Sequence, residues 1–211
     1  FLAGVRLAHF SGMLGLAGLS LAALAVSSPY RMERLTTFLN PWADPFDSGF
    51  QLTQSLIAIG RGELSGVGLG ASIQKLFYLP EAHTDFVFAV LAEELGLLGV
   101  FVVIALYAVV VWRAFAIAQQ AAKSGNVFAA SLAYGIGIWI SLQSFINMGV
   151  NMGLLPTKGL TLPLMSYGGS SMVVMCVAIA LLLRIDSETR CTLDGLSASG
   201  VAAAKRRRSM A

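Results

Sequence analysis

The fold class follows first from residues 86–112, which read FVFAVLAEELGLLGVFVVIALYAVVVW. Its only charged side chains are those of Glu93 and Glu94. About 20 consecutive apolar residues are enough for a helix to cross the hydrocarbon core of a bilayer. A run of this length and apolarity therefore predicts a membrane-spanning helix rather than the core of a soluble domain.

Three further stretches have the same character, at residues 10–28, 127–152 and 162–183. The first and the last of them contain no charged side chain. We therefore predict an all-α polytopic membrane protein with four transmembrane helices. Residues 29–85 then form a large extracytoplasmic loop, and residues 184–211 form a tail.

The composition excludes several other classes of protein. Of the 211 residues, 56% are hydrophobic and 12% are charged, whereas a soluble domain carries about 25% charged residues. This rules out a typical cytosolic enzyme and a disordered chain.

The two cysteines, Cys176 and Cys191, are too few for a disulfide framework or a zinc quartet. We expect no metal site from these residues, and the sequence identifies no cofactor, although a divalent cation such as Mg²⁺ is compatible with it.

The charge distribution predicts the topology. Arg113 and Lys123 lie in the short connector between the second and third stretches, and the tail from Arg184 onward accounts for the net charge of +3. Because short cytoplasmic loops are enriched in Lys and Arg, we place this connector and the tail in the cytoplasm. Residues 29–85 and 153–161 then face outward. The basic tail does not indicate a nucleic-acid partner.

The outer loop is too long to be a passive connector. It contains an apolar segment, residues 52–59, that is too short to span a bilayer and predicts an interfacial or re-entrant helix. Gly66, Gly68 and Gly70 follow it. No βαβ unit surrounds these glycines, so they indicate a flexible turn and not a dinucleotide site.

Asp85 stands at the outer end of the second stretch, after His83 and Thr84. One interpretation is a carboxylate that stabilises the start of a helix through its dipole. The other is catalytic, because a carboxylate at a water–lipid boundary can act as general base for a sugar hydroxyl of a membrane-anchored substrate.

Glu93 and Glu94 lie about two turns deeper in the same stretch. Neighbouring residues of a helix point about 100° apart, so at least one of the two must face the bundle interior, paired or protonated. A structural pairing role is the simpler interpretation for both.

Gln143, Asn147 and Asn151 follow a spacing of four residues and form a polar stripe on the third stretch. Such a stripe either makes hydrogen bonds between helices or lines a cavity. Lys158 lies in the outer loop after the stripe, where it is either a solvated charge or a contact for an anionic pyrophosphate. Ser166 and Tyr167 begin a segment of small and polar residues. Two interpretations of this segment remain open, close packing of helices and a role in catalysis.

These residues fall in motifs that resemble the SEDS family (shape, elongation, division and sporulation) of membrane proteins, over nearly the whole chain. The resemblance is to the C-terminal part of a ten-helix SEDS fold, so we expect this chain alone to be inactive. The residues at 156–163, PTKGLTLP, are more similar to the division branch of the family than to its elongation branch. The matching motifs are Asn40–Phe46, Gln51–Ser55, Tyr78–Phe86, Ala92–Gly96 and Leu155–Ser171.

The resemblance implies peptidoglycan glycosyl transfer, in which lipid II is polymerised into glycan strands during septal wall synthesis. It implies that Asp85 is the essential aspartate and general base. Lys158, His83, Arg61 and Lys75 are then candidates to bind the pyrophosphate or the sugars. The implied partners are lipid II, a class B penicillin-binding transpeptidase and other divisome proteins, in the bacterial inner membrane at the division septum.

Two other functions remain open from the sequence. A lipid II flippase would use polar groups inside the spans, such as Glu93 and Asn147, and would not need Asp85. A scaffold that recruits the transpeptidase would tolerate the loss of Asp85 and would depend on its lipid-facing surfaces.

Overall fold

The structure is a computed structural model that describes residues 6–27, 38–43, 49–74 and 83–208. The described residues form helices joined by turns and contain no strand. Four of the helices are long and apolar enough to cross a membrane. The helices are α1 (Leu7–Val26), α3 (Phe50–Arg61), α5 (Val87–Lys123), α6 (Val127–Asn151) and α7 (Gly169–Arg208).

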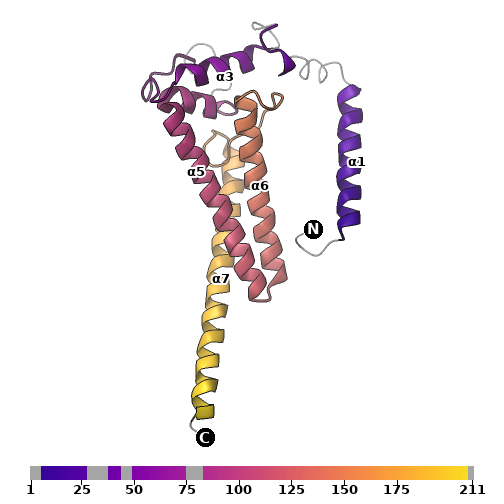
Figure 1. The fold of residues 1–211 in the computed structure, drawn as a ribbon, viewed down its shortest axis with the longest axis vertical. Coiled ribbons are helices and arrows are strands. Elements are labelled where there is room, and N and C mark those ends of the chain that lie inside the picture. Colours follow the sequence, from indigo (N-terminus) through magenta and orange to yellow (C-terminus); the bar gives the residue numbers. More distant parts are fainter. Residues whose placement is uncertain (1–5, 28–37, 44–48, 75–82, 209–211) are drawn as a thin grey trace.

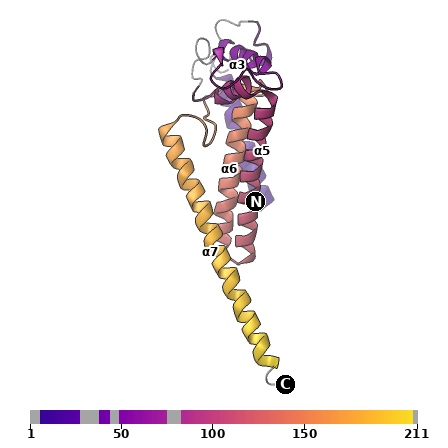
Figure 2. The same cartoon turned by 90° about the vertical axis from the view of Figure 1, so that its left-hand side faces the viewer.

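Helices α5 and α6 lie side by side and antiparallel, with α7 crossing them (Figures 1 and 2). A three-residue turn joins α5 to α6, in which Gly125 has a φ of 84° that favours glycine. The side chain of Asn126 then caps α6 by accepting a hydrogen bond from the Ala129 N–H at 3.1 Å. The short turn therefore makes the two helices immediate neighbours.

The core between these helices is built from small and branched side chains. A Cβ added to Gly137 would lie 3.1 Å from the Cβ of Ala114, so the backbones of α5 and α6 approach closely there. Helix α7 contributes one buried face, at a spacing of three and four residues. The buried apolar residues of that face are Met175, Ala178, Leu182 and Ile185.

Two helices are longer than the apolar stretches that predict them. The connector expected after residue 112 is helical as far as Lys123, because no turn residue occurs before Ser124 and Gly125. The expected fourth span at 162–183 begins as a turn, and α7 starts only at Gly169. Ser166 makes that turn, because its hydroxyl accepts the Leu162 N–H at 2.7 Å.

Helix α7 also runs through the expected tail at 184–211 as far as Arg208. Its 40 residues correspond to about 60 Å at 1.5 Å per residue, twice the roughly 30 Å of a bilayer core. The C-terminal half of α7 therefore projects beyond the apolar bundle, as the lower part of Figure 1 shows.

Helix α1 lies apart from the other helices (Figure 1). Its described side chains are all exposed, including those of Leu14, Leu16 and Leu19. The start of α1 and the end of α7 point toward the same end of the molecule, as four alternating crossings require.

Helix α3 lies across one end of α5 and α6 (Figure 1). The predicted topology places this end outside, so we call it the outer end of the bundle and the opposite end the inner end. It confirms the short helix predicted at residues 52–59 and buries one face, which includes Leu52 and Ala58. The Ser55 hydroxyl donates to the Asn151 carbonyl at 2.8 Å and so ties α3 to the end of α6. The α3 segment of the predicted outer loop is in this way part of the packed structure around Asp85.

Candidate functional site

Asp85 lies in the turn directly before α5 and is half-buried. Its backbone carbonyl accepts two hydrogen bonds from α6, from Nδ2 of Asn147 at 2.9 Å and from Nδ2 of Asn151 at 3.1 Å. The Oδ1 of Asn151 also accepts the Ala89 N–H, in the first turn of α5, at 3.2 Å. Two buried amides therefore fix the backbone from which the Asp85 carboxylate projects.

The Asp85 carboxylate lies against the loop that contains Lys158. A Cβ added to Gly159 would stand 3.0 Å from Oδ2 of Asp85, so the absence of a side chain at Gly159 leaves room for this carboxylate. Lys158 is exposed, and its carbonyl accepts the Leu160 N–H at 3.0 Å in a tight turn. The structure thus brings a carboxylate and the backbone of a lysine loop together at the outer end of the bundle.

The polar stripe of α6 bonds to this loop as well as to the Asp85 turn. Asn147 Nδ2 donates to the Leu160 carbonyl in addition to that of Asp85. Gln143 Nε2 donates to the Thr161 carbonyl at 2.9 Å. All three amides of the stripe are therefore engaged by backbone groups near the candidate base.

His83, Ser166 and Tyr167 border a hollow of about 660 Å³ beside the Asp85 turn. The Tyr167 N–H donates to the His83 carbonyl at 2.8 Å, which joins the two polypeptide segments that form its rim. Ser166 is buried, while His83 and Tyr167 are exposed. The other residues of the hollow are apolar, namely Val87, Val90, Met165 and Met172.

Glu93 and Arg61 lie together, away from these contacts. Glu93 is fully buried, and its Oε1 is 3.8 Å from Nη1 of Arg61 at the end of α3. Glu94 is half-buried on the next position of α5. Lys75, the remaining candidate cation, lies outside the described residues.

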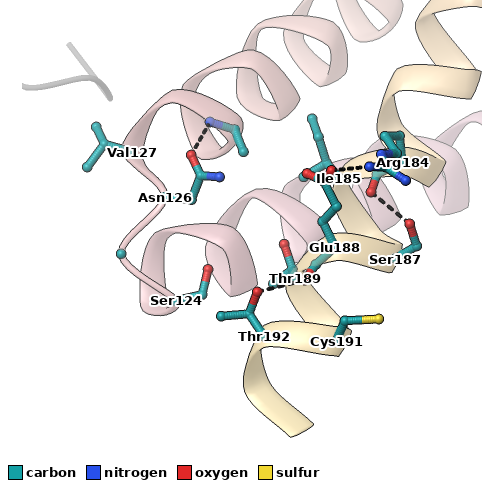
Figure 3. Close-up of a pocket in the computed structure, with 12 residues that line it drawn as sticks. Ser124, Asn126, Val127, Arg184, Ile185, Ser187, Glu188, Thr189, Cys191 and Thr192 are labelled. Atoms are coloured by element: carbon teal, nitrogen blue, oxygen red, sulfur yellow. Dashed lines mark hydrogen bonds and ion pairs between the residues drawn. The ribbon is translucent and has the colours of Figure 1, made fainter. Parts of the chain in front are cut away.

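A second hollow, of about 780 Å³, lies at the inner end of the bundle, between the α5–α6 turn and α7 (Figure 3). Arg184 and Glu188 at its edge form an ion pair of 2.5 Å. None of the candidate residues named from the sequence lines it. Within residues 6–27, 38–43, 49–74 and 83–208, no group of three or more His, Cys, Asp or Glu side chains could hold a metal ion.

The sequence did not identify several groups that the structure places at this site. Examples are Gly159 and the backbone carbonyls of Leu160 and Thr161. A glycine next to a lysine gives no indication in the sequence that a carboxylate will lie against it, and a backbone carbonyl is present at every position. Ser72, which bonds to Glu93, was also missed, since one serine in a polar loop is unremarkable in sequence.

Comparisons with known proteins agree on one family. A family model described as "Cell cycle protein", for FtsW, RodA and SpoVE, matches residues 1–191. A protein of Thioalkalivibrio sulfidiphilus named "Probable peptidoglycan glycosyltransferase FtsW" is 67% identical over 90% of this chain and 47% of its own length. A protein of the same name from Methylococcus capsulatus is 65% identical over 95% of this chain and 50% of its own length.

A solved structure described as "Structural coordination of polymerization and crosslinking by a peptidoglycan synthase complex" contains a similar chain. The TM-score is 0.64 at 31% sequence identity, over 88% of this chain and 51% of that one. The chain therefore spans about half the length of the relatives that it matches.

Proposed function

The chain belongs to the FtsW, RodA and SpoVE family of cell cycle proteins, and on that premise we propose that the full-length protein is a peptidoglycan glycosyltransferase that polymerises lipid II. The SEDS resemblance predicted from the motifs is confirmed, as is the all-α membrane fold with four long apolar helices. The protein is a multi-pass membrane protein.

The observation that supports the proposal is the position of the Asp85 carboxylate against Gly159, the residue that follows Lys158. In the reaction, a hydroxyl of one lipid-linked sugar attacks the sugar carbon that bears the pyrophosphate of another. Asp85 takes the proton of that hydroxyl as the new C–O bond forms. The bond to the pyrophosphate breaks, and its electron pair leaves with the lipid pyrophosphate.

Lys158 is proposed to stabilise the charge that develops on this leaving group. The exposed Lys158 side chain belongs to the same loop that contacts Asp85, which supports its choice over the other cations. Arg61 faces Glu93, so in this proposal it is not the first contact of the pyrophosphate. His83 and Tyr167 remain candidates for the sugar, because both border the hollow beside Asp85.

The proposal extends to partners and location. The similar solved chain belongs to a structure described as a peptidoglycan synthase complex that couples polymerisation and crosslinking. By that likeness we propose that the full-length protein works with a class B penicillin-binding transpeptidase and other divisome proteins. Its place is then the bacterial inner membrane at the division septum, with the tail in the cytoplasm.

The test is lipid II polymerisation by the full-length protein with its transpeptidase, for the native form, Asp85→Asn and Lys158→Ala. Asp85→Asn is expected to abolish glycan formation with membrane insertion unchanged, because an amide cannot accept the hydroxyl proton. Lys158→Ala is expected to slow the reaction about 10²-fold, as the removal of one charge-stabilising group does.

The matched control is Asp186→Asn, which makes the same change in a carboxylate that pairs with Arg190 at 2.8 Å on the inner part of α7. It is expected to polymerise at the native rate. Normal glycan chains from Asp85→Asn would overturn the assignment of the base. If the native protein made no glycan but moved lipid II across liposome membranes, the flippase function would replace the proposed one.

A further inference from the structure

Helix α5 is interrupted at Gly96, in the part of the chain expected to lie within the membrane. Gly96 has a φ of 65° and a ψ of −164°, far from helical values. A break of this kind leaves carbonyls before it and N–H groups after it without intrahelical partners. Inside a membrane such groups must be satisfied by protein, since lipid offers no hydrogen bonds.

Residues 62–68 of the outer loop supply those partners, and we call this segment the wedge. It donates to two carbonyls before the break and accepts from two N–H groups after it. The four hydrogen bonds run from Val67 N to Glu93 O at 3.0 Å, from Gly68 N to Glu94 O at 3.1 Å, from Leu97 N to Glu63 O at 2.9 Å and from Leu98 N to Leu64 O at 3.3 Å.

The wedge fits because three positions have no side chain. A Cβ on Gly62 would lie 1.9 Å from the Ala92 carbonyl oxygen, and one on Gly66 would lie 2.1 Å from the Glu94 carbonyl oxygen. A Cβ on Gly96 would lie 2.3 Å from the Gly66 nitrogen. The backbone of the outer loop therefore packs directly against the backbone of α5.

Side chains hold the wedge at both of its ends. The Ser72 hydroxyl donates to Oε2 of Glu93 at 2.5 Å, and Arg61 faces Oε1 of Glu93 at 3.8 Å. Arg61 precedes the wedge and Ser72 follows it, so one buried carboxylate engages both flanks of the segment. A buried carboxylate is unfavourable without a partner. Oε1 of Glu93 accepts no hydrogen bond from the described residues, so the bond from Ser72 to Oε2 and the ion pair with Arg61 are what favour the docked wedge.

The segment between the Asp85 turn and the break is short, at residues 87–95. It is tied to the wedge through Glu93 and Glu94 and is separated from the rest of α5 by Gly96. The position of Asp85 therefore depends on the wedge as well as on the part of α5 that follows Gly96. An error of about 1 Å in the position of a catalytic group can cost 10²-fold in rate.

We propose that Glu93 is a positioning residue that fixes Asp85 by holding the wedge of residues 62–68 in the break of α5. This role rests on the proposed function, because it presumes that Asp85 acts on the substrate. Glu93 itself does not touch the reacting atoms. It acts through the wedge and through the first two turns of α5.

The experiment uses the full-length protein with its transpeptidase and compares native, Ser72→Ala, Glu93→Gln and Ser144→Ala forms. Ser144→Ala is the matched control, because Ser144 is also a buried serine but bonds only within its own helix, to Ile140 O at 2.7 Å. Two quantities are measured, the kcat and KM for lipid II and the amide hydrogen exchange of the protein in nanodiscs.

Ser72→Ala is expected to lower kcat roughly 10-fold with KM unchanged, since the substrate contacts remain while the base is misplaced. Exchange should become faster at Val67, Gly68, Leu97 and Leu98 and stay native in residues 103–121. Glu93→Gln keeps an acceptor for Ser72 and should lose less activity than Ser72→Ala. Ser144→Ala should match the native protein in both measurements.

A native kcat for Ser72→Ala despite faster exchange in the wedge would overturn the proposal. A higher KM with an unchanged kcat would also overturn it, in favour of a direct contact between Arg61 and the substrate. If the native protein formed no glycan, the proposed function would fail and the positioning role with it. Hydrogen exchange needs no substrate, so in that case it would still report whether Ser72 and Glu93 hold the wedge.

Discussion

At the scale of single residues, Asn147 joins two segments that lie far apart in the sequence. Its Nδ2 donates both to the carbonyl of Asp85 and to that of Leu160, which follows the Lys158–Gly159 pair. The side chain is 2% exposed, so water cannot replace these bonds. One amide therefore sets the distance between the proposed base and the lysine loop.

We predict that Asn147→Asp lowers kcat for lipid II polymerisation about 10²-fold with little change in KM, because a carboxylate would repel both carbonyls and move Asp85. The control is Gln119→Glu, the same amide-to-acid change at an exposed position near the inner end of α5. Steady-state kinetics of the full-length protein check this. A native kcat for Asn147→Asp would show that the position of Asp85 does not depend on this amide.

At the scale of elements, α5 is two helical segments joined by a break that the outer loop completes. Gly66 and Gly68 separate two effects of a side chain in that loop. Both have positive φ, of 77° and 103°, but only a Cβ on Gly66 would meet another atom within 4 Å. An alanine at either site would be strained by the positive φ. Only at Gly66 would its Cβ also collide with the backbone of α5.

We predict that Gly66→Ala destabilises the folded protein by at least about 1 kcal/mol more than Gly68→Ala, because the wedge must withdraw from the Glu94 carbonyl. Thermal unfolding of the two variants in the same detergent, followed by tryptophan fluorescence, measures the difference. Equal unfolding midpoints would mean that the wedge is not packed against α5.

The polar stripe and the short outer helix show what sequence periodicity can predict at this scale. The four-residue spacing of Gln143, Asn147 and Asn151 places three amides on one face of α6, and the structure agrees. Their partners could not be predicted, since they are backbone carbonyls of irregular turns that carry no residue-specific signal.

At the scale of the whole molecule, the alternation of four apolar helices sets which ends lie on the same side of the membrane. Figure 1 shows α3, the start of α5 and the end of α6 at one end and the end of α7 at the other. Asp85 lies directly before α5, and Lys158 follows α6 in the chain. This arrangement places the proposed chemistry on the outer side if the basic tail is cytoplasmic.

We predict that a membrane-impermeant maleimide labels Leu154→Cys, but not Cys191, in intact cells from which the outer membrane has been removed. Leu154 is exposed in the outer loop after α6, and Cys191 is exposed on the inner part of α7. After the cells are broken, Cys191 should react as well. Labelling of Cys191 in intact cells would reverse the topology.

The class of the protein and the number and approximate place of its apolar helices could be predicted from the amino-acid sequence. These follow from local properties, because an apolar run of about 20 residues has few alternatives to a membrane helix. The family could also be predicted, since the motifs around Asp85 and Lys158 are long and specific. Helix ends were less well predicted, because α5 and α7 continue through polar residues that still favour helix.

The contacts that hold Asp85 could not be predicted from the sequence and are visible in the folded structure. The contact of its carboxylate with Gly159, its bonds to Asn147 and Asn151 and the wedge in the break at Gly96 all join residues distant in the chain. Such contacts are made by backbone N–H and C=O groups, which every residue has, and by glycines, whose role depends on what packs against them. Neither can be told apart in the sequence. Their partners are selected when the helices pack and each buried polar group must find a hydrogen bond.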